Sequence, residues 1–478
     1  MNTCQQNSTD LRFSRLCSKV QGPRRGGIAI QMAVVMSMIF GFTALTIDVG
    51  FVFMTRTQLQ SASDASALAG GTELRYGLGR FATATSSEVE VNIKAAADLF
   101  ASSNRVGDLS SAYLDQNRDV RMGRATYSDG IWYKEYDATP YNMVEIQLHR
   151  DIDGSVNGDR PLGLFFAPVL GTTQANLSTL ATAAVLPARG YVIAEQDELL
   201  PLIPFAFRAK LWRRFEAAQD WYTDPANNVT PGQIPQIGDA GYPMWDDPLD
   251  DPDQGSIHLF HQQDYDNQGN LIFDNQGNPV YRQDFFDDYS YSESTGQIDD
   301  DTPDGWLEAD LYPESTGGAI GSPGNAGTID LGDTNNSSSD LRRQIEEGIN
   351  YDDYQEMDGQ NVLTEGQFIL DPGNNITASV NGDTGLSAGP IGQGFEEILG
   401  DARVIALFDE DVVFGSGNNV VYTLVDFAGV RPVYQKLTGN DKRIWIQMAP
   451  VIDGTALPDL ENEVGSSTTL FTPVILID

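Results

Sequence analysis

A run of 20 residues without a charged side chain, Ile28–Ile47, constrains this chain more than any other feature of its sequence. At about 1.5 Å of rise per residue, a helix of this length spans roughly 30 Å, the thickness of the hydrocarbon core of a bilayer. A cleaved secretory signal would have a shorter apolar stretch and a small-residue cleavage site, which this run lacks. We therefore predict one transmembrane helix over residues 28–54, preceded by a basic head over residues 1–27.

The charged residues divide the chain into a basic start and an acidic remainder. The whole chain has 29 Lys and Arg against 68 Asp and Glu, a formal net charge of −39. Residues 1–25 hold five basic residues and one acidic residue, a net of +4, so the remainder carries −43. Basic flanks of membrane helices stay in the cytoplasm. We therefore predict a single-pass protein of the cell membrane, with a cytoplasmic N-terminus and an extracytoplasmic C-terminal region.

The composition also excludes several classes of function. Nucleic-acid binding depends on Lys and Arg that displace counterions from phosphates, so a surface this acidic argues against it. Both cysteines, Cys4 and Cys17, lie in the head, which excludes an intrachain disulfide beyond residue 17. No Ser/His/Asp or Cys/His arrangement suits nucleophilic catalysis. We predict that the protein is not an enzyme and, apart from a weak calcium site considered below, has no cofactor.

Two polar residues lie in or beside the apolar run. Gln31 lies one turn into it, where the side chain either bonds to a neighbouring helix or lies in the inner headgroup region. Asp48 follows the run directly, and a carboxylate in a membrane segment often pairs with a partner helix. Counting from Ile28, however, places Asp48 at the outer interface. We favour a hydrated interfacial Asp48 and keep the partner contact as the alternative.

Beyond Met54, small and apolar residues recur at spacings of three and four, which indicates that the helix continues outward as an amphipathic stalk. The stripe consists of Leu59, Ala62, Ala65 and Ala69. Gly70 and Gly71 are predicted to end this helix, because glycine commonly follows the last helical turn. The stripe packs either on the protein's own domain, which we favour, or on a helix of another subunit.

Several short motifs surround the apolar run in a fixed order. They are RRGG at residues 24–27, IDVG at 47–50, Leu59–Gln60, and DASALAGG at 64–71, which begins with Asp64. In this combination the segment resembles the N-terminal module of TadG-like proteins of tight-adherence (Flp-type) pilus systems. The resemblance covers about a tenth of the chain. It implies a membrane-anchored accessory or minor-pilin-like component.

The resemblance also bears on proteolytic processing. Pilins proper are cut after a glycine and carry a glutamate at the fifth mature position. A cut after Gly26 would place Gln31 there, and a cut after Gly27 would place Met32. Because neither residue is acidic, we predict that the chain is not processed and keeps its anchor.

The rest of the chain has patterns of both helix and strand. Val89, Ile93 and Ala97 have helical spacing, whereas Val144 and Ile146 belong to an alternating strand pattern. We predict an α+β fold in which a transmembrane helix and stalk lead to two extracytoplasmic mixed regions separated by an acidic, loop-rich segment. The predicted divisions are a stalk and second helix (55–105), a first domain (106–245), an acidic insertion or linker (246–327) and a second domain (328–478).

Two further segments have specific interpretations. The apolar stretch at residues 162–169 is too short to span a bilayer, and we predict that it is core. In the acidic segment, the first, third, fifth and seventh positions of a calcium loop are matched by Asp264, Asp266, Gln268 and Asn270. The twelfth position, which normally supplies a bidentate carboxylate, is Asn275. We favour plain hairpin turns and keep a weak extracellular calcium site as the alternative.

These expectations define a function that depends on binding rather than catalysis. We predict a membrane-anchored structural or assembly component of a Flp/Tad-type pilus, which binds partners non-covalently outside the membrane. The expected partners are pilus-assembly or minor pilin-like proteins and the membrane itself, and not nucleic acid. The alternative is a cell-surface adhesin or a calcium-binding matrix protein that shares the same anchor.

Overall fold

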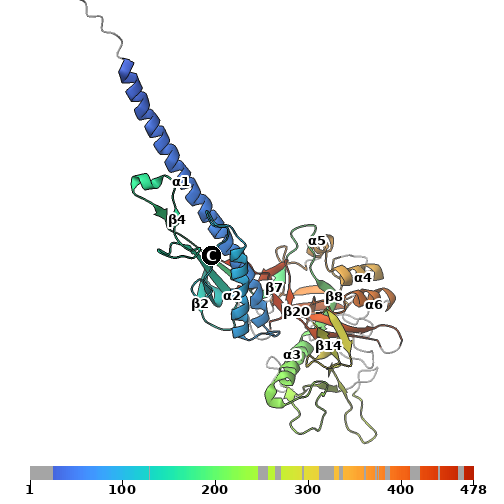
Figure 1. Cartoon of the computed structure of the whole chain (residues 1–478). Coiled ribbons are helices and arrows are strands. Elements are labelled where there is room, and N and C mark those ends of the chain that lie inside the picture. Colours follow the sequence, from blue (N-terminus) through green and yellow to red (C-terminus); the bar gives the residue numbers. More distant parts are fainter. Residues whose placement is uncertain are drawn as a thin grey trace, which may run out of the picture.

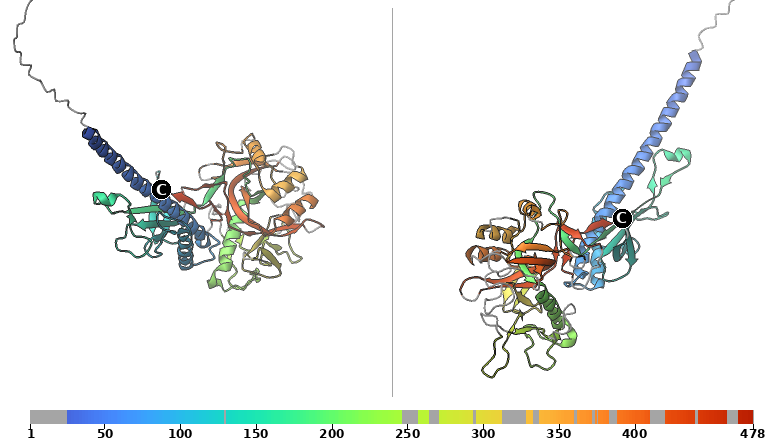
Figure 2. Two further views of the ribbon diagram at one scale, coloured as in Figure 1. Left: turned by 45° about the horizontal axis from the view of Figure 1, so that its top comes forward. Right: turned by 180° about the vertical axis from the view of Figure 1, so that it is seen from behind.

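Helix α1 (Arg25–Thr72) is 48 residues long and leads into two bodies of mixed helix and sheet (Figure 1). This computed structural model describes residues 25–477, with gaps at residues 129, 246–256, 264–270, 293–294, 312–327, 333–336, 360–361, 372–373, 375, 383–387, 410–419, 440–441 and 461–467. The N-terminal half of α1 projects away from both bodies, and the C-terminal half is built into the first of them (Figure 2). The fold is α+β, as predicted.

The first body comprises residues 55–186 and 472–477. Its core is a five-stranded antiparallel sheet, against which α1 and α2 (Ser86–Ser102) pack. In sheet order the strands are β2 (Ile131–Tyr136), β1 (Val120–Ser128), β3 (Met143–Arg150), β6 (Leu177–Ala184) and β25 (Ile475–Ile477). Because β25 pairs with β6, the C-terminal end of the described chain belongs to the same body as the C-terminal half of α1.

Local sequence explains the start and the orientation of α2. The Thr85 hydroxyl accepts a hydrogen bond from the Glu88 amide, and the Glu88 carboxylate accepts one from the Thr85 amide, a reciprocal cap that satisfies two free donors. Val89, Ile93 and Ala97 are buried. These residues recur at helical spacing, so α2 presents one apolar face to α1 and the sheet.

The second body comprises residues 187–471 and is organised around a seven-stranded sheet. Its main path is β13 (Phe285–Phe286), β16 (Glu308–Asp310), β21 (Arg443–Met448), β20 (Val421–Lys436), β19 (Arg403–Phe408) and β8 (Leu202–Arg208), and β18 (Ala378–Asn381) also pairs with β20. Its helices are α3 (Ala209–Thr223), α4 (Ser338–Glu347), α5 (Tyr351–Gly359) and α6 (Ala388–Glu397). Ile405 and Leu407 of β19 enter one apolar core, whereas Val404 and Ala406 enter another. The sheet is therefore buried on both faces, which explains the continuous apolar runs in its strands.

Short ladders and 3₁₀ turns complete the structure. The ladders pair β4 (Leu162–Gly163) with β5 (Gln174–Ala175), β9 (Met244–Trp245) with β10 (Ile257–His258), β11 (His261–Gln263) with β12 (Tyr281–Gln283), β14 (Tyr289–Ser292) with β15 (Gln297–Asp300), β22 (Val451–Ile452) with β24 (Leu470–Phe471), and β7 (Ala188–Tyr191) with both β17 (Phe368–Ile369) and β23 (Ala456–Pro458). The 3₁₀ turns are η1 (Glu73–Gly77), η2 (Ala167–Leu170) and η3 (Pro225–Asn227).

Strand pairings cross two of the predicted divisions between domains. The second body begins near residue 187 rather than at 328, because β8 pairs in parallel with β19. Pro204 lies within β8, at the point where the pairing with β19 shifts register. Within the segment 246–327, predicted as an insertion or a linker, β13 and β16 belong to the main sheet of the second body.

The end of α1 also differs from the prediction. The helix passes through Gly70 and Gly71 to Thr72. A Cβ atom added at Gly71 would lie 2.4 Å from Cγ1 of Val474 and 3.3 Å from Cβ of Ala183. The absence of a side chain at Gly71 therefore lets the segment that carries β25 pack directly on α1, rather than ending the helix.

Candidate functional site

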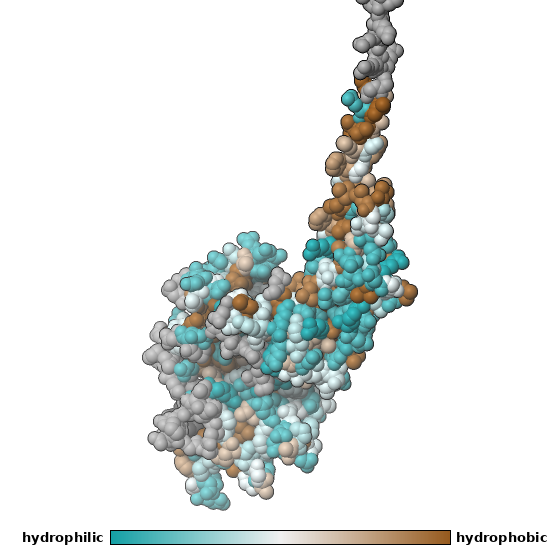
Figure 3. Space-filling model, turned by 90° about the vertical axis from the view of Figure 1, so that its left-hand side faces the viewer, coloured by the Kyte–Doolittle hydropathy of each residue, from teal (hydrophilic) through white to brown (hydrophobic). Residues whose placement is uncertain are grey.

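The N-terminal half of α1 is an apolar surface that is left exposed by the part of the chain that the structure describes. Every residue from 28 to 47 is exposed except Ala44, which is half-buried. The hydroxyls of Ser37, Thr43 and Thr46 each donate a 2.8 Å hydrogen bond to the carbonyl four residues earlier. Figure 3 shows apolar residues clustered along this part of the helix. Within the described residues, α1 is the one helix long and apolar enough to cross a membrane.

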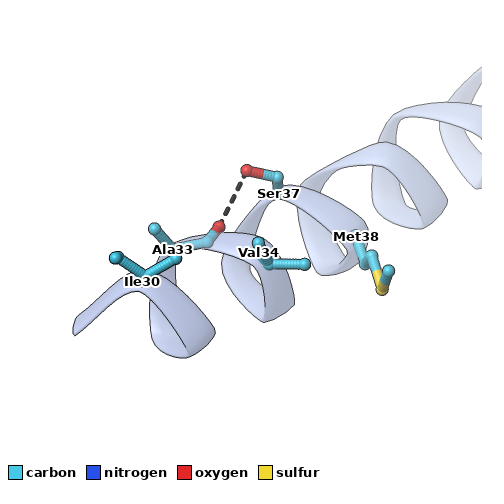
Figure 4. A pocket seen from close by; sticks show the side chains of 5 residues that line it. All are labelled: Ile30, Ala33, Val34, Ser37 and Met38. Atoms are coloured by element: carbon cyan, nitrogen blue, oxygen red, sulfur yellow. Dashed lines mark hydrogen bonds between the residues drawn. The ribbon is translucent and has the colours of Figure 1, made fainter. Parts of the chain in front are cut away.

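A close view of the same surface shows one stripe of these side chains. Ile30, Val34 and Met38 project along the helix, and the Ser37 hydroxyl turns back to the Ala33 carbonyl (Figure 4). Because the Ser37 hydroxyl donates to this carbonyl, its hydrogen is not available to a partner outside the helix. The predicted residue Gln31 is exposed on the same segment.

Asp48 marks the point where α1 first meets the rest of the chain. Its carboxylate is 2% exposed and accepts three backbone hydrogen bonds: from Phe165 (2.9 Å), Phe166 (2.9 Å) and Ala167 (2.6 Å). Successive amides at the start of a short helical turn bind an anion well, since none of them has a partner within the turn. In the structure, the buried Asp48 carboxylate is bonded within its own chain, an environment that differs from the two considered from sequence. It holds a loop of its own chain.

That loop, residues 162–175, is hereafter the apolar loop. It consists of β4, η2 and β5, and it extends from the first body along α1 towards the N-terminal end of that helix (Figures 1 and 2). The ring of Phe165 lies 5.0 Å from the ring of Phe51 on α1. Leu162 and Ala167 are buried, but Phe165, Phe166 and Val169 are exposed. The prediction that this stretch is core is therefore wrong for most of its large side chains.

The predicted stalk stripe lies against the protein's own first body. Leu59, Ala62 and Ala69 are buried, and Ala65 is half-buried. Between them, the Ser63 hydroxyl lies 2.7 Å from the Thr179 hydroxyl of β6. Asp64 is half-buried and accepts a 2.7 Å hydrogen bond from the Gln60 amide on the same helix. The stripe is thus part of a core formed with α2, β3 and β6.

The calcium hypothesis concerns Asp264, Asp266, Gln268 and Asn270, which all lie outside the described residues. Residues 274–278, whose sequence DNQGN repeats that of residues 266–270, are described, and they form a tight turn. Asp274 accepts hydrogen bonds from the amides of Gln276 and Asn278, which lower its pKa, and Phe273 bridges to Pro279 in antiparallel fashion. In the described parts of the chain, no group of three or more His, Cys, Asp or Glu side chains is arranged to hold a metal ion.

Several buried acids in the second body were not predicted from the sequence. Glu308 is fully buried and accepts hydrogen bonds from the Asp288 amide and the Gln447 side chain, both at 2.9 Å. Burial raises its pKa to about 9, against the opposing effect of these bonds. Asp287 is also buried and accepts bonds from the Tyr222 hydroxyl and the Gly232 amide. These carboxyls tie the acidic insertion to the main sheet and to α3.

The two bodies meet at the residues that follow η1. The Arg80 guanidinium contacts two acids of α3, Asp220 at 2.5 Å and Glu216 at 3.9 Å. Beside it, Phe81 packs against the core of the second body, with its ring 4.9 Å from that of Trp306. Burial raises the pKa of Glu216 to about 7, and the charge of Arg80 opposes that rise. Arg80 is therefore the cation that links the first body to α3.

Comparison with known proteins finds a family match for the N-terminal part of the chain. Residues 26–73 match the family model described as "Putative Flp pilus-assembly TadE/G-like", which confirms the resemblance to the TadG-like module. The match covers α1 and the first residue of η1, about a tenth of the chain. No curated protein matches the chain, and no solved structure does. The family therefore characterises the helix and its immediate continuation, and the two bodies have to be interpreted from their own geometry.

Proposed function

We propose that this chain is a membrane-anchored structural or assembly component of a Flp/Tad-type pilus. The observation that carries the proposal is the coincidence of the family match with the division of α1 into two halves. Residues 28–47 are uncharged and, apart from Ala44, exposed, whereas Leu59, Ala62 and Ala69 are buried in the first body. One continuous helix thus serves as anchor and as structural support, so that the bodies are held rigidly to the anchor.

The proposed orientation follows from charge. Residues 1–25 carry +4 and the remaining chain −43, which favours a cytoplasmic head and extracytoplasmic bodies. An acidic exterior keeps the bodies soluble by self-repulsion. The protein would act by non-covalent binding, without catalysis or a bound cofactor, because an anchor, a rigid support and an outer surface are sufficient for a scaffold.

The edge of the first sheet is the surface that we propose binds a pilus component. Strand β2 is at the end of the sheet order, and its exposed side chains include Ile131 and Tyr133. An edge strand offers unpaired backbone groups to an incoming strand, and neighbouring apolar side chains add specificity. Lys134 on the same strand is turned inward, where its ammonium contacts Glu145 at 3.2 Å.

Photo-cross-linking from membranes tests this function. A photoreactive phenylalanine replaces Tyr133, and the matched control is the same substitution at Phe273 of the second body, which is also aromatic and equally exposed at 53%. We expect pilin or assembly-platform subunits to be captured at position 133 more strongly than at 273. Capture of only polysaccharide or matrix proteins from both positions would contradict the proposal and favour the adhesin alternative.

The calcium-binding alternative is tested separately. Calorimetric titration of the full chain in detergent with calcium alone is compared with the Asp264→Asn/Asp266→Asn variant. We expect the wild type and the variant to give the same heat on titration with calcium. Binding that is lost in this variant would favour the calcium-dependent matrix protein over the pilus component.

A further inference from the structure

We propose that the apolar loop is a second membrane contact of this protein, which lies in the outer leaflet of the bilayer beside α1. The inference rests on the proposed membrane anchoring of α1 and adds a site to it. It concerns four large apolar side chains of this loop that are exposed next to one another. They are Phe165, Phe166, Val169 and Leu170, with exposed fractions of 63%, 45%, 89% and 76%.

The loop lies level with the boundary of the apolar helix. Asp48, which immediately follows the uncharged run, binds the amides of residues 165–167. Ala44 is the one half-buried residue of the exposed run, and η2 contacts α1 in this region. From Asp48 to Ala44 the helix rises about 6 Å. The loop therefore reaches about one helical turn into the segment that we assign to the bilayer.

The composition of the loop suits lipid better than water. From Pro161 to Ala188 the chain has no Asp, Glu, Lys or Arg, although 20% of all residues are charged. Towards the bodies, the nearest charged residue of α1 is Arg56, which is exposed and lies eight residues, or about 12 Å, from Asp48. If the loop lies among the upper acyl chains, the Arg56 guanidinium, about 12 Å further out, lies among the lipid headgroups.

The backbone of the loop is also prepared for an apolar medium. In hydrocarbon, every backbone donor needs a partner within the protein, since an unsatisfied group costs several kcal/mol. The amides of residues 165–167 bond to Asp48, and those of Leu164, Val169, Gly171 and Thr172 bond to carbonyls of the loop at 3.1–3.2 Å. Position 168 is proline, which has no amide hydrogen. The loop thus presents apolar side chains on a backbone in which these seven amide donors are already bonded.

The occupant that fits these observations is lipid rather than a protein. The exposed apolar side chains of the loop adjoin the uncharged surface of α1, where Phe165 contacts Phe51, and the Asp48 carboxylate at the junction is bonded to three amides of its own chain. A helix and a loop that enter the same leaflet make two points of contact. They would fix the tilt of the first body on the membrane and the direction in which its β2 edge faces.

Site-specific fluorescence quenching in lipid vesicles tests the proposal. In a full chain with Cys4→Ser and Cys17→Ser, an environment-sensitive fluorophore is placed at Val169→Cys or Leu170→Cys. The matched control is Val156→Cys, which is 97% exposed in another loop of the same body. Met38→Cys reports on the anchor itself. The quenchers are phosphatidylcholine brominated near the headgroup end of its chains, and aqueous iodide.

We expect labels at positions 169 and 170 to be quenched by the brominated lipid and shielded from iodide. A label at position 156 should be quenched by iodide and not by the brominated lipid. If 169 and 170 behave like 156 while position 38 is quenched by lipid, the loop proposal is overturned and the anchor stands. If position 38 is also open to iodide, the anchoring itself is wrong. Shielding of 169 and 170 from both quenchers, lost on dilution of the protein in the vesicles, would indicate a second copy and overturn the lipid assignment.

Discussion

The amide of Ala167 donates a 2.6 Å hydrogen bond to the carboxylate of Asp48, 119 residues earlier in the chain. With the amides of Phe165 and Phe166, it forms a three-donor site for one anionic side chain. Hydrogen bonds to a charged acceptor are stronger than those between neutral groups, and they are stronger still away from water. This contact fixes the apolar loop at the level where α1 leaves the first body.

Removal of the Asp48 carboxylate should release the loop. Asp48→Ala leaves three amides without their acceptor, and each lost bond to a charged group is worth about 1.5–3 kcal/mol. We expect hydrogen exchange at residues 165–167 to accelerate by at least about tenfold, measured by mass spectrometry on the reconstituted protein. Asp64→Asn is the control, because the Asp64 carboxylate accepts a hydrogen bond from the Gln60 side chain on the same helix, and its replacement should leave the loop unchanged. Unaltered exchange in Asp48→Ala would contradict the assigned role.

The joint between the two bodies should depend on Arg80. Arg80→Ala removes the cation beside Glu216 and Asp220, and the pKa of Glu216, already about 7, should rise further. We expect a loss of about 1–3 kcal/mol in stability at pH 8 and a separation of the two bodies into distinct unfolding transitions in calorimetry. Arg75→Ala is the control, since Arg75 bonds to the neighbouring Tyr76 hydroxyl. A single, unshifted transition in Arg80→Ala would show that the joint does not need this contact.

The second body should be more stable in mild acid than at alkaline pH. Burial raises the pKa of Glu308 from 4.5 to about 9 and that of Asp310 from 3.8 to about 7. A carboxyl whose folded-state pKa is raised contributes most below its unfolded pKa, and this contribution is lost as pH rises towards the folded value. We expect stability to fall between about pH 5 and 9, as monitored by denaturant unfolding of the second body. Glu308→Gln should be more stable than the wild type at pH 8, by a few kcal/mol, and less pH-dependent.

The first body should respond to acid with the opposite sign. Although burial by itself raises the pKa of Asp108, the hydrogen bond and charge of Arg150 lower it below its usual 3.8. The stability from such a group is present above pH 4 and is lost as pH falls through the folded value. The full chain should therefore lose first-body structure before second-body structure on acidification, as resolved by hydrogen exchange. Loss in the reverse order would contradict the assignment.

Arg150 itself should be important for the first body. It is fully buried and donates to the carbonyls of Arg160 (2.7 Å) and Val106 (3.1 Å) as well as to Asp108 (2.7 Å). Arg150→Met removes the donor from these two carbonyls and the cation beside Asp108, and we expect a loss of about 2–4 kcal/mol in denaturant unfolding. Arg160→Met is the matched control: its exposed side chain faces the same Asp108 at 3.6 Å, and its loss should change stability by less than about 1 kcal/mol.

The close approach at Gly71 should also be measurable. Gly71→Ala raises helix propensity by about 1 kcal/mol, but it places a methyl group 2.4 Å from Cγ1 of Val474. Because Val474 is stiff at χ1, we expect a net destabilisation of about 1–3 kcal/mol. Val474→Ala should tolerate Gly71→Ala better than the wild type does, and Gly41→Ala, with no atom within 4 Å, should cause no loss. Equal effects at positions 41 and 71 would contradict this reading of the packing.

The sequence by itself determined the features that depend on residues close together in the chain. Twenty uncharged residues are enough for an apolar helix, and the spacing of Leu59, Ala62 and Ala69 is enough for its continuation as a stalk with one packed face, because helical periodicity is local. The same holds for the strand pattern of residues 143–149, now β3, and for the capping of α2 by Thr85. The family motif lies within this local part.

Only the tertiary structure decided which distant segments meet. From its position after the uncharged run, Asp48 was predicted to lie at the membrane interface. Its three donors could not be foreseen, because they lie at positions 165–167 and no local pattern connects them to Asp48. Residues 162–169 looked like core because apolar composition alone does not tell a buried side chain from one exposed beside an apolar helix. The division of the bodies was hidden for the same reason: β8 is parallel to β19, about 200 residues later, and the pairing of parallel strands depends on backbone hydrogen bonds that side-chain periodicity does not record.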